Sequence, residues 1–319
     1  MVAVLDIKYV VFGHRDVGAA ERFYHDFGLV TAGRTEDRVF LRGAGEDPYV
    51  YVAEASDRPG LRVIGMEARS FADLEEAARF PESGPIETIS WPGGGRRVRL
   101  SSPEGLQFEI VHGIAPVAPL PMRDPLAFNH AREKARLGNW QRANQEPAAV
   151  LRLGHVALTT ADYRRSAEWL ESRLGMRPSD ILFDGTPDNA LGGFFHCAGG
   201  GGWTDHHTIA LFPARAANVH HSSFEVQDVD AQFLGHQFLR SRGWQPLWGV
   251  GRHILGSQIF DYWFDPSGNV VEHFTDGDLV GEDHKVEFHQ VSDDSLAQWG
   301  PPMEVARFID RLPADEKHQ

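Results

Sequence analysis

The amino-acid sequence predicts an α+β fold in which two tandem domains are copies of one another. The first observation is a pair of similar passages, residues 7–30 and 153–176. Each shows a strand, a short turn, an amphipathic helix and then a glycine. The second is a pair of hairpins, residues 98–113 and 261–277, in which a Pro-x-Gly turn joins a strand to another strand that carries a glutamate. The chain therefore reads as an internal duplication.

Within each copy the order of strand, helix and further strands occurs twice, with the second starts near Leu61 and Val219. We therefore expect four βαβββ modules, two to a domain. The predicted domain organisation is an N-terminal domain, a connector, a C-terminal domain and a tail, at residues 1–113, 114–149, 150–280 and 281–319. In the second copy the helix is expected over residues 164–174, with Gly175 as its stop.

Strand alternation predicts what each sheet face does. In LRLGHVALT, Val156 and Leu158 share a face that suits packing against helices, whereas His155 and Ala157 point the other way. We expect each domain to form a curved mixed sheet with helices outside and the opposite faces lining a cavity. The polar side chains on those inner faces are then the candidates for chemistry.

The regions between and after the copies are less regular. Tyr9 corresponds to His155 and Glu109 to Glu272, so the second copy is longer by 17 residues, and Asp184–Asp205, rich in Gly and Asp, is the expected place for this insertion. The connector begins with a stiff Pro-rich stretch and is expected to become helical up to about residue 145. A short closing helix is expected around residues 303–312.

Composition limits the classes of function. A formal net charge of −14 argues against a nucleic-acid binder and does not favour an anionic membrane surface. The single cysteine, Cys197, excludes an internal disulfide and a multi-cysteine metal site, and suits a reducing compartment. Neither a signal peptide nor an apolar run of about 18 residues is visible, so a cytoplasmic protein is expected.

Three strand residues of the second copy, His155, His221 and Glu272, form a candidate metal centre. Two histidines and one carboxylate leave coordination positions open and are typical of non-haem Fe(II) enzymes. A structural zinc site would close with four ligands and would usually contain more cysteine. Each histidine alone is more often an ordinary core or surface residue, but their joint occurrence in one repeat favours the metal centre.

The first copy is an internal control for this interpretation. Tyr9 stands at the position of His155, and Met66 at the expected position of His221, while Glu109 matches the glutamate. We therefore expect no metal site in the N-terminal domain.

The motifs GHVAL, HHTIALF, HHSSFEV and GRHILGSQIFDYWFDPSGNVVEHFTDGD together resemble the type I extradiol ring-cleaving dioxygenases of the vicinal oxygen chelate superfamily. The resemblance covers nearly the whole chain. It implies a mononuclear Fe(II) centre held by His155, His221 and Glu272, with O2 as co-substrate; Mn(II) can occupy the same ligand set. It also implies a catechol-type substrate and a homo-oligomer.

The same resemblance assigns three further residues. His207 matches the acid/base histidine beside the O2 position, although the adjacent His206 competes for this place on alternation alone. His253 matches the histidine that hydrogen-bonds a substrate hydroxyl, and Tyr262 the tyrosine beside the deprotonated catechol oxygen. A histidine whose pKa lies near neutrality would suit the acid/base role.

Two alternatives stay open. One is a glyoxalase-like metal-dependent isomerase or thiol transferase on the same scaffold, and the other is a non-enzymatic small-molecule binding protein. The residues expected to line the pocket suggest a substrate with an apolar substituent. They do not distinguish among single-ring, two-ring and trihydroxylated catechols. These residues are Phe194, Phe195, Trp203, Trp248, Leu255, Ile259 and the 184–205 insertion.

Overall fold

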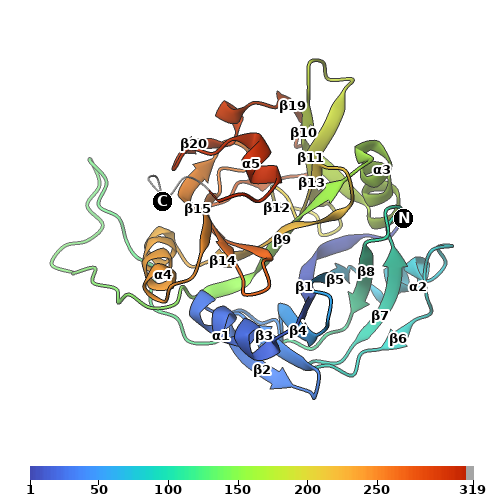
Figure 1. Ribbon diagram of the computed structural model, residues 1–319, viewed down its shortest axis with the longest axis horizontal. Helices are drawn as coiled ribbons and strands as arrows, with labels where there is room; N and C mark the ends of the chain where they lie inside the picture. The colour runs from blue at the N-terminus through green and yellow to red at the C-terminus, as the bar shows by residue number, and fades with distance from the viewer. Residues whose placement is uncertain (314–319) are drawn as a thin grey trace.

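Each half of the chain forms one large curved sheet in the computed structural model, which describes residues 1–313 (Figure 1). The elements of the first half are β1 (Val4–His14), α1 (Val17–Phe27), β2 (Val30–Arg34), β3 (Arg38–Arg42), β4 (Tyr51–Ala55), β5 (Gly60–Ala68), α2 (Phe71–Ala77), β6 (Glu87–Thr88), β7 (Arg96–Ser101) and β8 (Gln107–His112).

The second half repeats this order, with some longer elements and two additional short strands, β12 and β18. Its elements are β9 (Val150–Thr160), α3 (Tyr163–Leu174), β10 (Met176–Phe183), β11 (Ala190–Cys197), β12 (Thr204–Asp205), β13 (Ile209–Pro213), β14 (Asn218–Val226), α4 (Val229–Ser241), β15 (Pro246–His253), β16 (Ile259–Phe264), β17 (Val270–Thr275) and β18 (Leu279–Val280). The predicted α+β fold of four βαβββ modules is confirmed.

Strand order shows how two modules join into one sheet. The first sheet runs β2-β3-β4-β1-β5-β8-β7-β6, with one module on each side of the antiparallel β1–β5 pair. The second sheet has the same core order, β10-β11-β13-β9-β14-β17-β16-β15, around the antiparallel β9–β14 pair. The central strands β9, β14 and β17 are therefore neighbours, which is what brings residues far apart in the chain to one place.

The two faces of these strands behave as alternation predicts. Val156 and Leu158 belong to the main apolar core, which continues across both halves and includes side chains of the helices. Ala157 belongs to a separate cluster on the concave side of the second sheet. Side chains on the concave faces are therefore separated from the main core and are free to build a site.

Local signals fix where the helices begin and end. The side chain of Asp162 accepts a hydrogen bond from the Arg165 amide and caps α3, and Asp16 does the same for α1. Both helices end at a glycine with positive φ, Gly28 at 114° and Gly175 at 63°. The stop predicted at Gly175 is confirmed.

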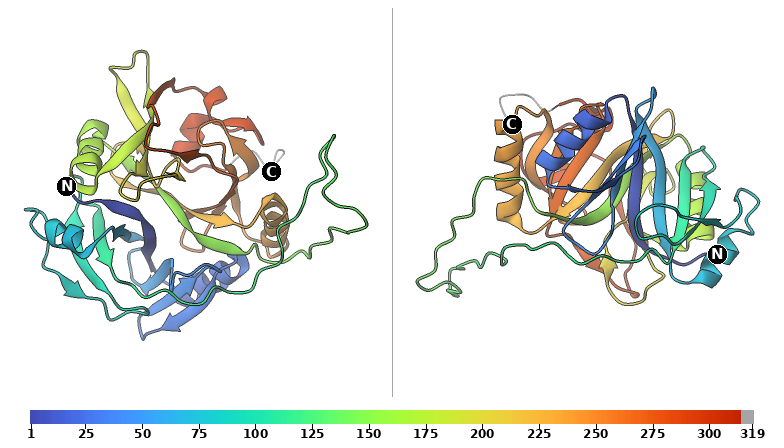
Figure 2. Two further views of the ribbon diagram at one scale, coloured as in Figure 1. Left: turned by 180° about the vertical axis from the view of Figure 1, so that it is seen from behind. Right: turned by 90° about the horizontal axis from the view of Figure 1, so that it is seen from below.

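The connector between the halves is not helical, which corrects the expected helix before residue 145. Residues 113–149 form no helix. Residues 115–120 are hydrogen-bonded to the first half, and the middle part, with an isolated bridge between Asn129 and Lys134, projects as an extended arm away from both sheets (Figures 1 and 2). Prolines interrupt its first part, and the remainder has no packed surface on which an amphipathic helix could bury a face.

The C-terminal tail completes the second sheet at both edges. Strand β19 (Glu287–Gln290) pairs in parallel with β10, and β20 (Ala297–Trp299) pairs antiparallel with β15. Between these edges the tail forms a 3-10 turn, η1 (Asp293–Ser295), and after β20 it forms α5 (Val305–Ile309), within the expected helical range. The tail thus crosses the concave side of the sheet (Figure 1).

No helix among residues 1–313 is long and apolar enough to cross a membrane.

Candidate metal centre and substrate cavity

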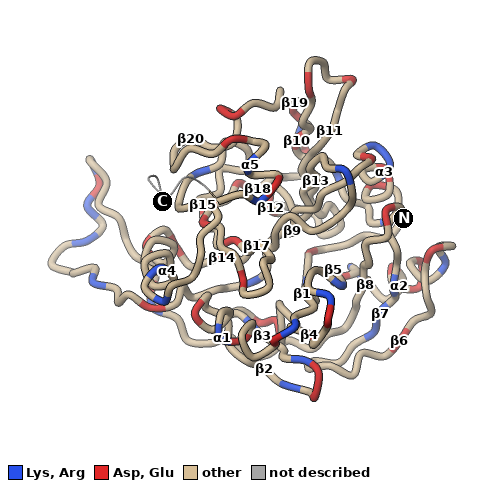
Figure 3. Tube along the Cα trace, viewed as in Figure 1, with Lys and Arg blue, Asp and Glu red and all other residues tan. Residues whose placement is uncertain are grey.

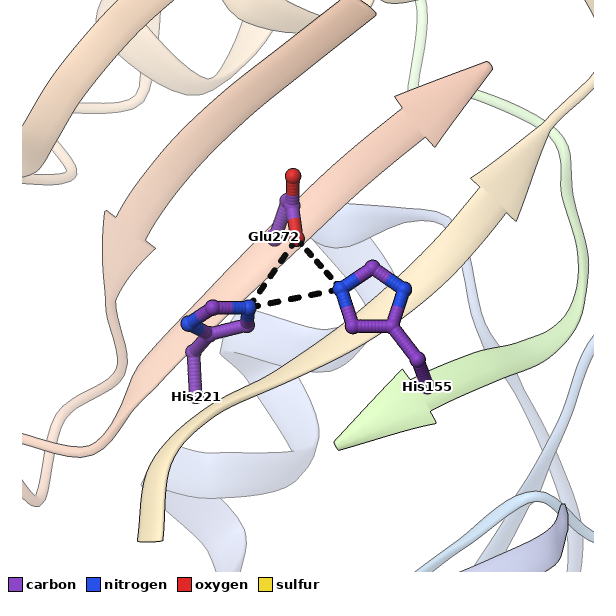
Figure 4. A group of neighbouring side chains, drawn as sticks. All are labelled: His155, His221 and Glu272. Atoms are coloured by element: carbon purple, nitrogen blue, oxygen red, sulfur yellow. Dashed lines mark hydrogen bonds and ion pairs between the residues drawn. The ribbon is translucent and has the colours of Figure 1, made fainter. Parts of the chain in front are cut away.

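Three neighbouring strands bring His155 (β9), His221 (β14) and Glu272 (β17) together on the concave face (Figure 4). The Nε2 atoms of the two histidines are 3.4 Å apart, and they lie 3.1 Å and 3.3 Å from Oε2 of Glu272. All three side chains are buried. Strand pairing explains the meeting, because Ser223 lies opposite both His155 and Glu272, and His221 is two residues away on the same face.

These atoms have the spacing and chemistry of metal ligands. At a metal–ligand distance of about 2.1 Å, ligand atoms lie about 3.0 Å apart at right angles and about 3.4 Å apart in a tetrahedron, and the observed distances fall in this interval. Neither carboxylate oxygen of Glu272 has a hydrogen-bond partner among the described residues. Burial would raise the pKa of Glu272, but the nearby His155 and His221 outweigh it and hold that pKa well below its ordinary value. A buried carboxylate without donors needs a cation.

Hydrogen bonding fixes the tautomer of His221. His220 Nε2 lies 2.6 Å from the carbonyl oxygen of Phe308, which can only accept, so this nitrogen carries the proton. Neutral His220 then has a bare Nδ1, which lies 2.7 Å from Nδ1 of His221 and accepts its proton. His221 is left with an unprotonated Nε2 directed at Glu272 and His155, as a metal ligand requires.

Hydrogen bonds fix the proton positions of His206 and His207 in the same way. Nε2 of His206 lies 2.8 Å from Oδ2 of Asp180 and donates to it, which leaves Nδ1 of His206 to accept from Nδ1 of His207 at 3.1 Å. Nε2 of His207 is therefore unprotonated. His207 lines the cavity with its ring centroid 4.3 Å from that of His155, whereas His206 does not line the cavity.

The acidity of His207 differs from the expectation of a pKa near neutrality. Burial, reinforced by the adjacent His155 and His206, lowers the pKa of His207 well below its ordinary value. Asp180 also binds Nε2 of His289 at 3.0 Å, and burial of the Asp180 carboxylate is outweighed by its two histidine partners, which lower its pKa. Asp180 thus anchors a chain of hydrogen bonds that ends at the cavity.

On the opposite wall His253 and Tyr262 form a hydrogen-bonded pair. Nδ1 of His253 donates to the carbonyl oxygen of Leu296 at 2.8 Å, so Nε2 accepts from the Tyr262 hydroxyl, also at 2.8 Å. Burial lowers the pKa of His253 to about 4 and, with the charge of Glu272, raises that of Tyr262 well above its ordinary value. Both residues are therefore neutral at pH 7.

The cavity in front of these residues is mainly apolar, but its walls are only partly those predicted. Phe194 and Leu255 line it, as expected. Phe195 is part of the main core, Trp203 is 73% exposed at another surface hollow, and Trp248 is buried behind Tyr262, with its ring centroid 5.9 Å from that of the tyrosine. The C-terminal tail supplies residues that the prediction omitted, namely Val291, Ser295, Leu296, Val305, Phe308 and Ile309.

The corresponding region of the first half is filled. Strand pairing places Val63 at the position of His221, because Gly65 lies opposite Tyr9 and Glu109 as Ser223 lies opposite His155 and Glu272. Met66, the expected counterpart, lies on the other face of β5, so that assignment was wrong by three residues.

Aromatic and cationic side chains occupy the rest of this region. The Tyr9 hydroxyl donates to Glu109 at 2.5 Å, and the guanidinium groups of Arg97 and Arg99 lie 3.3 Å and 3.1 Å from the same carboxylate. The position of His207 is held by Tyr49, 5.1 Å from Tyr9 between ring centroids. An internal tyrosine and two arginines thus satisfy Glu109, whereas in the described part of the chain Glu272 is paired only with its two histidines.

The strand registers also show where in the second copy the additional residues lie. The difference in residue number between equivalent positions is 146 at Tyr9 and His155. It is 158 at Tyr51 and Ile209, and 163 at Glu109 and Glu272. Most of the added residues lie between β10 and β13, around the expected 184–205 region. The remainder lies between β14 and β17, where the prediction placed none.

Residues 152–273 match the family model of the Glyoxalase/Bleomycin resistance protein/Dioxygenase superfamily. A protein of Cupriavidus necator named Metapyrocatechase 2 is 28% identical over 306 residues, which cover 94% of this chain and 90% of the relative.

Two solved structures share the whole fold. The Mn(II)-bound glyoxalase from Novosphingobium aromaticivorans has a TM-score of 0.80 at 25% identity, covering 99% of this chain and 96% of its own. Homoprotocatechuate 2,3-dioxygenase from Brevibacterium fuscum, in complex with 3,4-dihydroxyphenylacetate, has a TM-score of 0.79 at 19% identity, covering 98% and 93%.

Proposed function

We propose that the chain cleaves catechols with O2 by the extradiol route, since its residues 152–273 match the Glyoxalase/Bleomycin resistance protein/Dioxygenase superfamily model and it is similar to Metapyrocatechase 2. The observation that carries the proposal is an open three-ligand centre, His155, His221 and Glu272, flanked by His207 on one side and by the His253–Tyr262 pair on the other. Its similarity to Metapyrocatechase 2 over nearly the whole chain supports the same reaction.

The ligand set suits a divalent ion, and we propose Fe(II), with Mn(II) as the alternative. When bound by these residues, Fe(II) supplies a Lewis-acid site for adjacent catechol oxygens and electrons for O2. Two neutral imidazoles and one carboxylate give the centre a low net charge, and three protein ligands leave positions for other molecules.

Tyr262 and His253 orient the aromatic hydroxyls. Because the Tyr262 hydroxyl donates its proton to His253, its oxygen presents lone pairs to the cavity and accepts a hydrogen bond from a catechol hydroxyl. His253 does not keep a proton, since burial lowers its pKa to about 4. The pair therefore binds a hydroxyl and fixes its direction, while remaining neutral itself.

His207 is the base that faces the cavity. Its bare Nε2 accepts a proton, and its Nδ1–H stays hydrogen-bonded to His206, which holds the ring in place. Because the pKa of His207 is lowered, the accepted proton is weakly held and is readily returned to a product oxygen. The net reaction adds both atoms of O2 to the catechol and opens the ring beside the two hydroxylated carbons, so no external reductant is consumed.

Anaerobic reconstitution tests this proposal. Protein loaded with Fe(II), and in parallel with Mn(II), is mixed with an oxygenated solution of a catechol, and O2 uptake and ring-fission absorbance are followed together. We expect both signals with Fe(II). Metal binding without O2 uptake for any catechol would refute the dioxygenase proposal.

The similarity to the Mn(II)-bound glyoxalase supports a second candidate, a metal-dependent isomerase. The two candidates differ in one measurable way, because an isomerase changes its substrate without consuming O2. Turnover of a thiol adduct of a 2-oxoaldehyde under strictly anaerobic conditions would favour the isomerase.

We also propose that the chain forms a homo-oligomer through its arm. Phe128, Leu137 and Trp140 are 47%, 80% and 79% exposed, which is costly for apolar side chains. Residues 123–142 contain five Lys and Arg against two Asp and Glu, in a chain whose net charge is −14 (Figure 3). A basic apolar arm is complementary to the acidic surface of a second copy.

Light scattering after size-exclusion chromatography tests the arm. The wild-type chain should elute as an oligomer, and replacement of Phe128, Leu137 and Trp140 by serine should yield monomers with an unchanged far-UV CD spectrum. A wild-type monomer at micromolar concentration would overturn this assignment.

A further inference from the structure

We infer that the cavity selects uncharged catechols with an apolar substituent, and that the C-terminal segment 291–309 is the part of the chain that imposes this choice. The inference rests on the proposed extradiol function and adds the substrate class to it. Three observations carry it: the chemistry of the cavity walls, the place of the tail in the sheet and the hydrogen bonds that join the tail to the site.

The walls divide into a polar end and an apolar end. The polar end consists of His155 and His221 of the candidate metal centre and of His207, His253 and Tyr262, which flank it. Apart from Gln258 and Ser295, the other lining side chains are apolar and come from β10–β13, the loop after β15 and the tail; those of the tail are Val291, Leu296, Val305, Phe308 and Ile309. A catechol held by its two oxygens therefore extends its ring and any substituent into an apolar region.

A charged substituent has no partner in this region. Among the described residues, none of the side chains that line the cavity is Lys, Arg, Asp or Glu, and the only polar ones beyond the polar end are Gln258 and Ser295. The nearby cation Arg252 is engaged with Asp276 at 2.6 Å and with the Ser257 carbonyl oxygen. A carboxylate entering the cavity would lose its hydration without gaining an ion pair, which strongly disfavours it.

The tail is built into the domain rather than laid over it. Its strands β19 and β20 pair with the two edge strands of the sheet, β10 and β15, and α5 lies between them across the concave side (Figure 1). Phe308 is buried at 3% exposure, whereas Val305 and Ile309 are half-buried, as residues at a cavity mouth would be. The shape of the apolar end is therefore set by the folded tail.

The same segment also contacts the polar end of the cavity. The carbonyl oxygen of Leu296 accepts from His253, and that of Phe308 accepts from His220, the residue that fixes the tautomer of His221. The side chains of Leu296 and Phe308 line the cavity, so two residues contribute both a backbone oxygen that orients a site histidine and an apolar surface. Displacement of the tail by a poorly fitting substituent would thus disturb the catalytic histidines.

A pair of isosteric substrates tests the inference. 4-Isobutylcatechol and 3,4-dihydroxyphenylacetate carry substituents of similar shape, and only the second is charged. Unsubstituted catechol is the reference. Binding to the metal-loaded protein is measured by anaerobic calorimetry, and kcat and KM are measured by O2 uptake.

We expect isobutylcatechol to bind at least about tenfold more tightly than catechol, because about three buried carbon groups contribute. We expect dihydroxyphenylacetate to fall at least about 100-fold below isobutylcatechol in kcat/KM, with the loss visible in the binding constant as well. Equal or better use of dihydroxyphenylacetate would overturn the inference while leaving the extradiol function intact. Failure of all three compounds to consume O2 would instead refute the underlying function.

A charge introduced at the cavity mouth provides the converse test. Val305→Arg places a guanidinium at the apolar end and should improve binding of dihydroxyphenylacetate at least about tenfold while weakening that of isobutylcatechol. Ala306→Arg is the matched control, because Ala306 is exposed on the same helix and does not line the cavity. Equal effects of the two variants would show that general surface charge, and not the tail wall, determines the preference.

Discussion

The hydrogen bond between His220 and His221 offers a direct way to perturb the metal centre without touching a ligand. In His220→Leu the carbonyl oxygen of Phe308 loses its donor and Nδ1 of His221 loses its acceptor, and both groups are buried. His221 can then place its proton on Nε2, where it would block the metal. We therefore predict weaker metal binding from a residue that cannot itself reach the ion.

The magnitude follows from the two lost hydrogen bonds. Each of the two buried groups left without a partner costs about 1–3 kcal/mol, so the metal-free protein should lose about 2–6 kcal/mol of unfolding free energy. Removal of a residue that orients a metal-bound histidine lowers metal affinity by about 10–100-fold. His220→Gln should recover part of both losses, because a carboxamide can donate to Phe308 and accept from His221.

Two assays separate these effects. Urea unfolding of the metal-free protein measures stability, and Mn(II) titration followed by electron paramagnetic resonance measures affinity. His196→Leu is the control, since His196 is a buried histidine of the same sheet that hydrogen-bonds Ser179 and not a ligand. If His220→Leu lost stability but bound Mn(II) as tightly as this control, the tautomer argument would be refuted.

Three further predictions concern the hydrogen-bond chains and their protonation. His207→Phe should bind metal within about twofold of wild type and lose at least about 100-fold in kcat, measured by O2 uptake, since general acid–base catalysis contributes about that much; loss of metal from this variant would make His207 a ligand instead. Asp180→Asn should lower kcat about tenfold with KM nearly unchanged, because His206 keeps its place but loses a charged acceptor; a change confined to KM would contradict this. Burial lowers the pKa of His273 from its ordinary value of 6.5 to about 3. Below pH 6.5 the unfolded chain therefore binds a proton at this residue that the folded chain does not bind. This one group should therefore destabilise the metal-free protein by about 2 kcal/mol between pH 6.5 and 5, and His273→Gln should remove that part of the pH dependence of urea unfolding; an identical pH slope in the variant would count against it.

Local sequence patterns predicted much of the fold because the relevant signals are themselves local. Helix α3 begins after a capping aspartate and ends at Gly175, and the hairpin β16–β17 follows from its Pro-x-Gly turn. The duplication then implied that both halves would have the same sheet order. The connector was mispredicted because a polar stretch forms a helix only when a partner surface buries one of its faces, and residues 127–146 are largely exposed.

The parts of the candidate site that depend on residue type could be predicted from the sequence. The parts that depend on strand register or on contacts between residues far apart in the chain could not. His155, His221 and Glu272 stand out because their types are rare on buried strands, whereas Val63 could be matched to His221 only after pairing was known. The doubled histidines at 206–207 and 220–221 were a usable signal: in each pair the first histidine fixes the proton of the second. No local pattern indicates that the tail returns to the cavity.

The proposed reaction opens the aromatic ring beside, and not between, its two hydroxylated carbons. Identification of the product after complete turnover of catechol by the Fe(II)-loaded protein tests this most directly, with O2 uptake recorded in the same vessel. The structure predicts one O2 consumed per catechol and a hydroxylated semialdehyde acid as the product. A dicarboxylic acid formed by cleavage between the hydroxylated carbons, or unchanged catechol beside a metal-loaded protein, would contradict it.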